Sequence, residues 1–173
     1  MQGQIKEELE VIVTRKGTEF ELVGEQPKVG NAAPNFTLKN LEDKEIRLEE
    51  LKGQPVLISV VPDIDTRICS LQTKRFNQEA GAVEGVAFLT ISNNNKEEQS
   101  SWCAAEGVDM EMLRDEANTF GEAYGLFIPE MGRLARAIFV VDKDGVLAYE
   151  RISPEIAEEP DYTEALEKAK ALR

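Results

Sequence analysis

The sequence predicts an α/β fold in which a mixed central sheet has helices on both faces. Two segments, 56–61 and 86–91, are nearly all apolar and rich in β-branched residues, which is typical of central strands covered on both faces. Each precedes a stretch with helical periodicity, so strands alternate with helices along the chain. Near the C-terminus, segments 135–141 and 146–152 are joined by the turn residues 142–145, which indicates that an antiparallel pair closes the sheet.

An N-terminal β-hairpin is predicted before the central strands. The β-prone runs 11–14 and 20–23 are separated by residues 15–18, which are mostly polar and include a glycine. After a loop with prolines and glycine, two short strands at 36–38 and 45–48 flank another polar turn. Nothing in this region signals a second domain.

Capping residues indicate where the first two helices begin. Asp65 or Thr66 is placed to cap a helix that follows the first central strand. Asn95 and Glu98 have the spacing of a capping box, which predicts a second helix that stops near Gly107.

Two further helices complete the pattern. A short helix is predicted over 119–124, and Asp161 with Glu164 is placed to cap a last helix that runs to about Leu172. Strands that alternate with helices and close on an antiparallel pair match the thioredoxin architecture.

Length and composition fit one folded unit. A chain of 173 residues is expected to form a single domain, residues 1–173, and to bury roughly 70% of the surface of its unfolded form. Hydrophobic residues make up 42% and charged residues 31%, which excludes the disordered and fibrous classes.

The net charge argues against several kinds of partner. With 20 basic and 33 acidic residues the chain carries −13, so its field repels nucleic-acid backbones and anionic lipid surfaces. No apolar run approaches the roughly 20 residues that span a bilayer, and residues 1–10 are polar and acidic rather than signal-like. We therefore expect no nucleic acid, no membrane and a cytoplasmic location.

The absence of histidine excludes whole classes of chemistry. Without it the chain cannot form a Cys-His or Ser-His nucleophile pair, a His-ligated metal site or a histidine general base. The two cysteines are too few for an all-cysteine zinc site or an iron–sulfur cluster, so we expect no metal and no cofactor. A permanent disulfide is not expected in a reducing cytoplasm, so if the cysteines act together, they act by redox chemistry.

Cys69 is the first candidate reactive residue. It falls in the first turn of a helix that begins just after a buried strand and Pro62, where unpaired backbone N–H groups and the helix dipole favour a thiolate. The alternative is a small buried hydrophobic residue on the core face of the helix.

The run from Pro62 to Cys69 has the spacing Pro-x-x-x-Thr-x-x-Cys, and on it the chain resembles the thiol peroxidase subfamily of the peroxiredoxins. The resemblance covers about Val11 to Leu172. It continues through residues 71–77, 103–107, 134–137 and 155–162.

The resemblance implies a role for each residue of this motif. Cys69 is expected to attack the peroxide, Pro62 to shield it, and Thr66 to hydrogen-bond both the sulfur and the substrate oxygen. Donors at both ends of the breaking O–O bond would stabilise the transition state. Without the resemblance, Thr66 is only a helix cap and Pro62 only a turn residue.

Arg136 lies in the otherwise apolar run 134–141, where a guanidinium is rarely buried without an anionic partner. The Cys69 thiolate is a candidate partner, which makes Arg136 a candidate catalytic residue. The alternative is a strand-end arginine paired with a surface carboxylate. Arg133, three residues earlier, is assigned to a loop.

Cys103 follows Cys69 by 34 residues, which is the separation that the resemblance implies for a resolving cysteine. The two cysteines do not form a C-x-x-C pair, and Lys74 stands where other peroxiredoxins have a resolving cysteine in the same helix. The alternative is an inert core thiol beside Trp102.

The resemblance implies a complete catalytic cycle. Cys69 reduces alkyl or lipid hydroperoxides and hydrogen peroxide, Cys103 converts the resulting sulfenic acid into an intramolecular disulfide, and thioredoxin reduces that disulfide. A homodimer with a role in antioxidant defence is implied as well. The alternatives are a disulfide oxidoreductase or redox sensor without peroxide turnover, and a non-enzymatic acidic interaction module.

Two features depart from the subfamily pattern. The segment 126–133 is shorter than its usual counterpart, which affects the expected rim of the substrate pocket and the dimer contact. Arg67 stands where the family commonly has proline or a small residue, and it adds a cation near Cys69.

Overall fold

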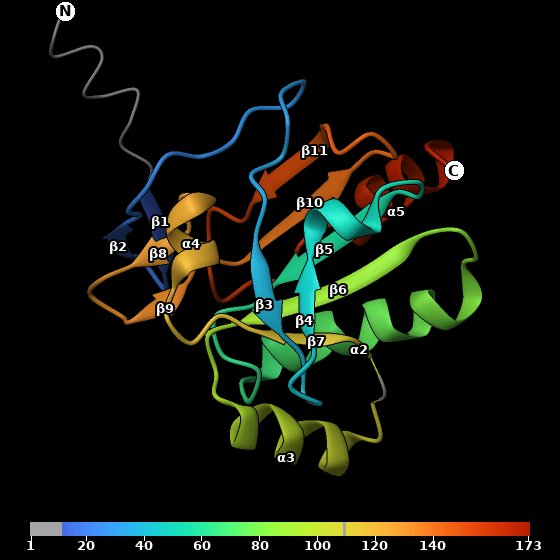
Figure 1. The fold of residues 1–173 in the computed structure, drawn as a ribbon. Coiled ribbons are helices and arrows are strands. Elements are labelled where there is room, and N and C mark those ends of the chain that lie inside the picture. Colours follow the sequence, from blue (N-terminus) through green and yellow to red (C-terminus); the bar gives the residue numbers. More distant parts are fainter. Residues whose placement is uncertain (1–11, 109) are drawn as a thin grey trace, which may run out of the picture.

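A seven-stranded mixed sheet forms the centre of the computed structural model, which describes residues 12–108 and 110–173 (Figure 1). The strand order is β11-β10-β5-β6-β7-β3-β4, with β5, β6 and β7 parallel and the other pairs antiparallel. The strands are β3 (Thr37–Lys39), β4 (Glu45–Arg47), β5 (Val56–Val60), β6 (Ala87–Ser92), β7 (Met112–Arg114), β10 (Ala137–Val141) and β11 (Leu147–Ile152). The predicted mixed sheet is confirmed.

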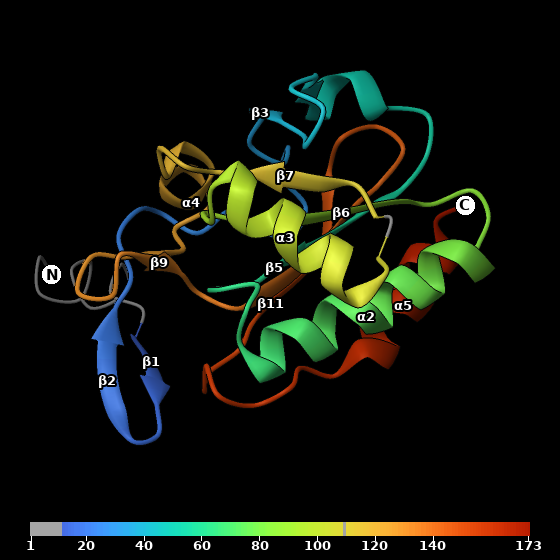
Figure 2. The ribbon, with the colours of Figure 1, turned by 90° about the horizontal axis from the view of Figure 1, so that it is seen from below.

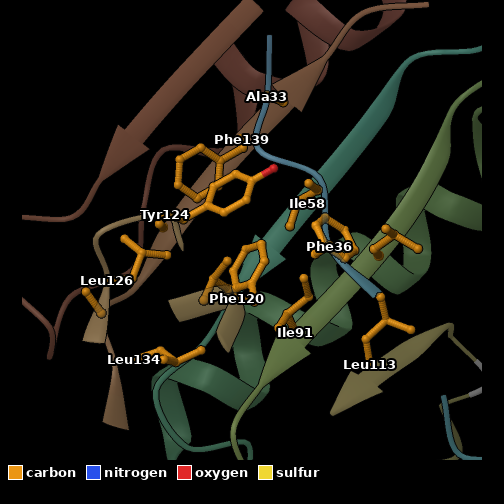
Figure 3. Packing of buried hydrophobic residues seen from close by; sticks show 14 of the residues in the cluster. Ala33, Phe36, Ile58, Ile91, Leu113, Phe120, Tyr124, Leu126, Leu134 and Phe139 are labelled. Carbon is orange, nitrogen blue, oxygen red and sulfur yellow. The ribbon is translucent and has the colours of Figure 1, made fainter. Parts of the chain in front are cut away.

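Helices cover both faces of this sheet, as predicted. Leu57 of β5 and Ile138 of β10 pack in one apolar cluster with α2 and α5, which lie together in Figure 2. Ile58 and Phe139 face the opposite side, where they pack with α4 residues such as Phe120 (Figure 3). None of the described helices is long and apolar enough to cross a membrane. The helices are the 3₁₀ helix η1 (Leu48–Leu51) and the α-helices α2 (Arg67–Ala82), α3 (Lys96–Glu106), α4 (Thr119–Ala123) and α5 (Tyr162–Ala171).

The predicted N-terminal hairpin is present as a separate sheet of β1 (Ile12–Arg15) and β2 (Thr18–Glu21). Its turn residues Lys16 and Gly17 have φ angles of 52° and 90°, the positive values that a tight hairpin turn requires. Val11, where the first strand was predicted to start, lies outside the described residues. Figures 1 and 2 show the hairpin beside β9, away from the central sheet.

Helix α3 is fixed at its N-terminal end by a capping box and an ion pair. The predicted capping box is formed, because Asn95 accepts from the Glu98 N–H and Glu98 accepts from the Asn95 N–H. Lys96 adds a 2.7 Å ion pair with Asp43, which comes from the β3–β4 turn. The helix ends at Gly107, as predicted, and this residue has the left-handed conformation typical of a helix C-terminus.

The other two predicted caps differ in detail. Thr66 occupies the cap position of α2, but its hydroxyl donates to the Asp63 carbonyl at 2.9 Å instead of accepting a backbone N–H. Asp161 caps α5 as predicted. Glu164, predicted to cap with it, lies in the first turn of α5.

Three short strands were not predicted. They are β7 in the central sheet and the two-residue pair β8 (Phe127–Ile128) and β9 (Arg133–Leu134), which turns the shortened 126–133 segment into a hairpin. Arg133 therefore lies in a strand and not in a loop. The prediction that Arg136 lies within a strand was also wrong, since β10 begins at Ala137 and Arg136 occupies the link between β9 and β10.

Candidate active site

Cys69 lies in the first turn of α2, which follows β5 through Pro62, as the sequence predicted. Its side chain is 1% exposed. Two donors approach its Sγ atom: the Asp63 backbone N–H at 3.5 Å and Nη2 of Arg136 at 3.4 Å. Both donors are placed to hydrogen-bond the sulfur, and such bonds strengthen when the acceptor carries a charge.

Arg136 is only 2% exposed, and its guanidinium is fixed by three further hydrogen bonds. Nε and Nη2 donate to the Ile156 carbonyl at 3.0 and 2.7 Å, and Nη1 donates to Oε1 of Gln72 at 2.9 Å. Within the described part of the chain Arg136 takes part in no ion pair with a carboxylate. Its partners are therefore oxygen dipoles and the Cys69 sulfur, as expected if that sulfur is the anionic partner.

Gln72 is a site residue that the sequence interpretation missed. It is fully buried in α2, and its Nε2 donates to Oγ of Ser59 in β5 at 2.8 Å while its Oε1 accepts from Arg136. The side chain thus links the helix, the central strand and the guanidinium. The signal was present, because Gln72 lies one turn after Cys69 on the same face as the buried Phe76, where a polar residue needs buried partners.

Pro62 and Thr66 both line the cleft in front of Cys69. Pro62 is buried there. The single hydroxyl proton of Thr66 is directed to the Asp63 carbonyl, so in this state it is not offered to the sulfur. Its predicted bonds to sulfur and substrate therefore require rotation of the hydroxyl and remain predictions.

Cys103 lies on α3 and is half-buried against the apolar cluster that contains Cys69. Trp102 and Met112 belong to this cluster too, so both cysteine-bearing helices contribute to one small core. No disulfide joins the two cysteines, and each lies within an intact helix.

A cleft of about 650 Å³ opens in front of Cys69. Its walls come from the β1–β2 hairpin, the loop and first turn of α2, the β8–β9 turn and residues 156–157. Arg133 lines it as well, with its Nη2 atom 3.5 Å from Oδ2 of Asp63. The hairpin and the shortened 126–133 segment therefore both shape the pocket rim.

Glu155 fastens the hairpin to this cleft. Its carboxylate accepts from the Ala157 N–H at 2.8 Å, from the Thr14 hydroxyl at 2.8 Å and from the Lys16 N–H at 3.1 Å. The Ala157 N–H has the largest effect and lowers the pKa of Glu155 below its usual value; burial opposes it, and the Thr14 hydroxyl and the Lys16 N–H lower the pKa further. The ionised carboxylate therefore stabilises the docked hairpin.

Acid is expected to loosen the hairpin. Because the pKa of Glu155 is lowered by folding, its contribution is fully present above the ordinary value of 4.5 and is lost as the pH falls through the lower folded value. Glu155→Gln should increase amide hydrogen exchange in β1 and β2 roughly tenfold at pH 7, since hydrogen bonds to a charged group are replaced by weaker ones. The measurement is exchange by mass spectrometry, with Glu158→Gln as control; equal exchange in both variants would contradict the anchoring role.

Fold and site together define a thiol-dependent oxidoreductase with a thioredoxin-like architecture. Residues 29–150 match the model of the AhpC/TSA family. The chain is 44% identical over 160 residues to the thiol peroxidase of Listeria innocua and 42% identical over 162 residues to that of Bacillus subtilis. These alignments cover 91% and 92% of this chain and 97% of each relative.

Solved structures show the same architecture. A peroxiredoxin-like protein from Aquifex aeolicus is 34% identical, with a TM-score of 0.89 and coverage of 95% of this chain and 99% of that one. A thiol peroxidase from Chromobacterium violaceum, 20% identical with a TM-score of 0.80 over 91% of this chain and 94% of its own, shares the fold. The chain belongs to the AhpC/TSA family, and its function is that of a thiol-dependent peroxidase.

Proposed function

We propose that Cys69 is the residue that reduces the peroxide. Its thiolate attacks one oxygen of the hydroperoxide, so that an S–O bond forms as the O–O bond breaks. The leaving oxygen takes up a proton and departs as an alcohol or as water, and Cys69 becomes a sulfenic acid. Arg136, Thr66 and Pro62 act around this step as the resemblance implies.

The observation that carries this proposal is the convergence of two fixed donors on a buried sulfur. The Asp63 N–H and the Arg136 guanidinium both reach Sγ, and Gln72 and the Ile156 carbonyl hold that guanidinium in place. Donors that are already oriented need no reorganisation when charge moves from sulfur to oxygen. A merely structural cysteine would need neither a buried cation nor its supporting bonds.

Cys103 is proposed to resolve the sulfenic acid. Its sulfur attacks the Cys69 sulfur, a disulfide forms, and the hydroxyl group leaves as water. An external dithiol then reduces the disulfide, and the resemblance supports thioredoxin in this role. The resemblance also supports a homodimer, which sedimentation analysis of the purified protein would test. The cytoplasmic location stays a prediction from the sequence.

The cycle is tested by following NADPH oxidation in the presence of hydroperoxide, thioredoxin and thioredoxin reductase. We expect turnover that depends on both the peroxide and thioredoxin. Oxidation of the cysteines to a disulfide without continued peroxide consumption would favour the alternative of a redox sensor. Turnover with another dithiol protein but not with thioredoxin would replace only the proposed reductant.

Oxidation is expected to unwind the first turn of α2 and part of α3. A disulfide needs Cα atoms about 4.4–6.8 Å apart, whereas Cys69 and Cys103 lie on separate intact helices. Trp102, the only tryptophan, adjoins Cys103 and is buried, so its fluorescence should report the change. Identical fluorescence and amide exchange around both cysteines in the reduced and oxidised proteins would contradict this prediction.

A further inference from the structure

We propose that the cleft selects organic hydroperoxides that carry a negatively charged group, and that Lys16 and Arg67 bind this group. The inference rests on the proposed function, because it takes the cleft in front of Cys69 to be the peroxide site. It adds the chemical class of the preferred substrate and two residues that determine it.

The first observation is the charge of the cleft. The chain carries −13, yet the cleft is lined by five cationic residues and by only two carboxylates, those of Asp63 and Glu130. Arg136 donates a hydrogen bond to the Cys69 sulfur, and Arg133 forms an ion pair with Asp63. The three remaining cations, Arg15, Lys16 and Arg67, take part in no ion pair among residues 12–108 and 110–173.

Lys16 stands at a position where the backbone does not favour lysine. Its φ angle of 52° lies in the left-handed region, and hairpin turns of this kind prefer asparagine, aspartate or glycine there. Glu155 binds its backbone N–H, which fixes the residue on the rim without neutralising its ammonium group. The turn explains the backbone conformation but not the choice of a cationic side chain.

Arg67 is also placed against local preference. It is the first residue of α2, where the helix dipole disfavours a cation, and the first turn of α2 contains no acidic residue to offset it. The side chain is exposed and lines the cleft. Two cations that local structure disfavours thus face one cleft from different elements, which indicates an anionic ligand.

The cleft is also larger and more apolar than hydrogen peroxide requires. Its volume of about 650 Å³ is in the range of sites for drug-sized ligands. Phe20, Ile68, Met131 and Ile156 supply apolar lining in the same cleft as the cations and Cys69. Apolar walls with a cationic rim fit an amphipathic anion, such as a hydroperoxide of a long-chain carboxylic acid.

The test compares two substrates that differ only in charge. A fatty-acid hydroperoxide and its methyl ester have the same chain and the same peroxide group, so the ratio of their kcat/KM values isolates recognition of the carboxylate. We expect the ratio to favour the acid in the wild type and to fall roughly tenfold in the double variant Lys16→Gln/Arg67→Gln, since exposed ion pairs contribute a few-fold each. Lys143→Gln, on the exposed β10–β11 turn and outside the cleft, should leave the ratio unchanged.

A second measurement does not depend on turnover of an organic peroxide. Decanoate, which has the charge and an apolar chain but no peroxide group, should inhibit hydrogen peroxide turnover competitively, and decanol should inhibit it less. The double variant should lose this difference. High salt should reduce the acid-to-ester ratio of the wild type, because exposed charges are screened.

The possible failures are distinguishable. Equal kcat/KM values for acid and ester in a wild-type enzyme that still reduces hydrogen peroxide would overturn the inference and leave the proposed function intact. No turnover of any peroxide would contradict the proposed function itself. An unchanged acid-to-ester ratio with a raised KM for thioredoxin in the double variant would assign the cations to the reductant and overturn the inference.

Discussion

Replacing Cys69 with serine is expected to abolish peroxidase activity, and replacing Cys103 with serine is expected to leave a single turnover. A serine hydroxyl remains neutral in the setting that favours a thiolate, so the O–O bond meets no effective nucleophile. In Cys103→Ser, Cys69 still reacts but stops at the sulfenic acid, because no resolving thiol follows. Each chain should then consume about one peroxide, unless another thiol rescues it.

Peroxide consumption by the pre-reduced proteins, counted per chain, separates these outcomes. Mass spectrometry of the products should find sulfenic acid or its oxidised derivatives in Cys103→Ser and an unmodified Cys103 in Cys69→Ser. Steady-state activity of Cys69→Ser equal to the wild type would refute the assignment of the peroxide-reducing residue. Equal steady-state activity of Cys103→Ser would refute intramolecular resolution.

Replacing Arg136 with methionine should slow the attack on peroxide by a factor on the order of 100, the usual effect of removing one fixed donor from a transition state. The thiolate loses its nearest cation, and the developing charge on oxygen loses a donor. Folding should survive at some cost in stability, because an apolar side chain of similar length fills the buried site while the Ile156 carbonyl and Oε1 of Gln72 lose their donor. Stopped-flow kinetics give the second-order rate constant for peroxide. Ultraviolet absorbance gives the fraction of Cys69 that is present as thiolate.

Two further variants test whether the effect is specific to the position and the geometry of Arg136. Arg151→Met removes an exposed arginine from β11 and should leave the rate unchanged. Arg136→Lys keeps the charge but not the forked geometry that reaches the Ile156 carbonyl, Gln72 and sulfur together. Its rate constant should therefore lie between those of the wild type and Arg136→Met. A wild-type rate in Arg136→Met would place Arg136 among the purely structural residues.

Sequence patterns predicted the elements that are specified locally. The capping box of Asn95 and Glu98, the helix end at Gly107 and the apolar strand β5 depend on residues that are close in sequence, and all three were confirmed. Strands β8 and β9 have two residues each, so no periodicity can develop. Their pairing with each other, and not their composition, makes them strands.

The site was only partly predictable for the same reason. The sequence singled out Cys69 and Arg136, because a cysteine in the first turn of a helix and an arginine in an apolar run are locally unusual. The partners that fix the guanidinium are Gln72 and the carbonyl of Ile156, which lie 64 and 20 residues away from Arg136. Glu155 meets the hairpin across 141 residues at Thr14, a contact that only the folded chain creates.

The uneven anchoring of α3 bears on how far Cys103 can move. The capping box and the ion pair of Lys96 with Asp43 hold the first turn, and at the other end Glu106 pairs with Lys74 of α2 through partly exposed side chains. Unwinding that begins at the Gly107 end breaks this second pair and leaves the first turn as a fixed pivot. A helical residue advances the chain by about 1.5 Å and an extended one by about 3.3 Å, so each residue that leaves the helix adds almost 2 Å of reach. Only residues between the pivot and Cys103 add to its reach, so unwinding from the Gly107 end as far as residue 100 would release four of them, 100–103, and extend the reach of Cys103 by about 7 Å. Partial unwinding of α3 can then bring the Cys103 sulfur toward Cys69 while the first turn of the helix stays attached to the β3–β4 turn of the sheet.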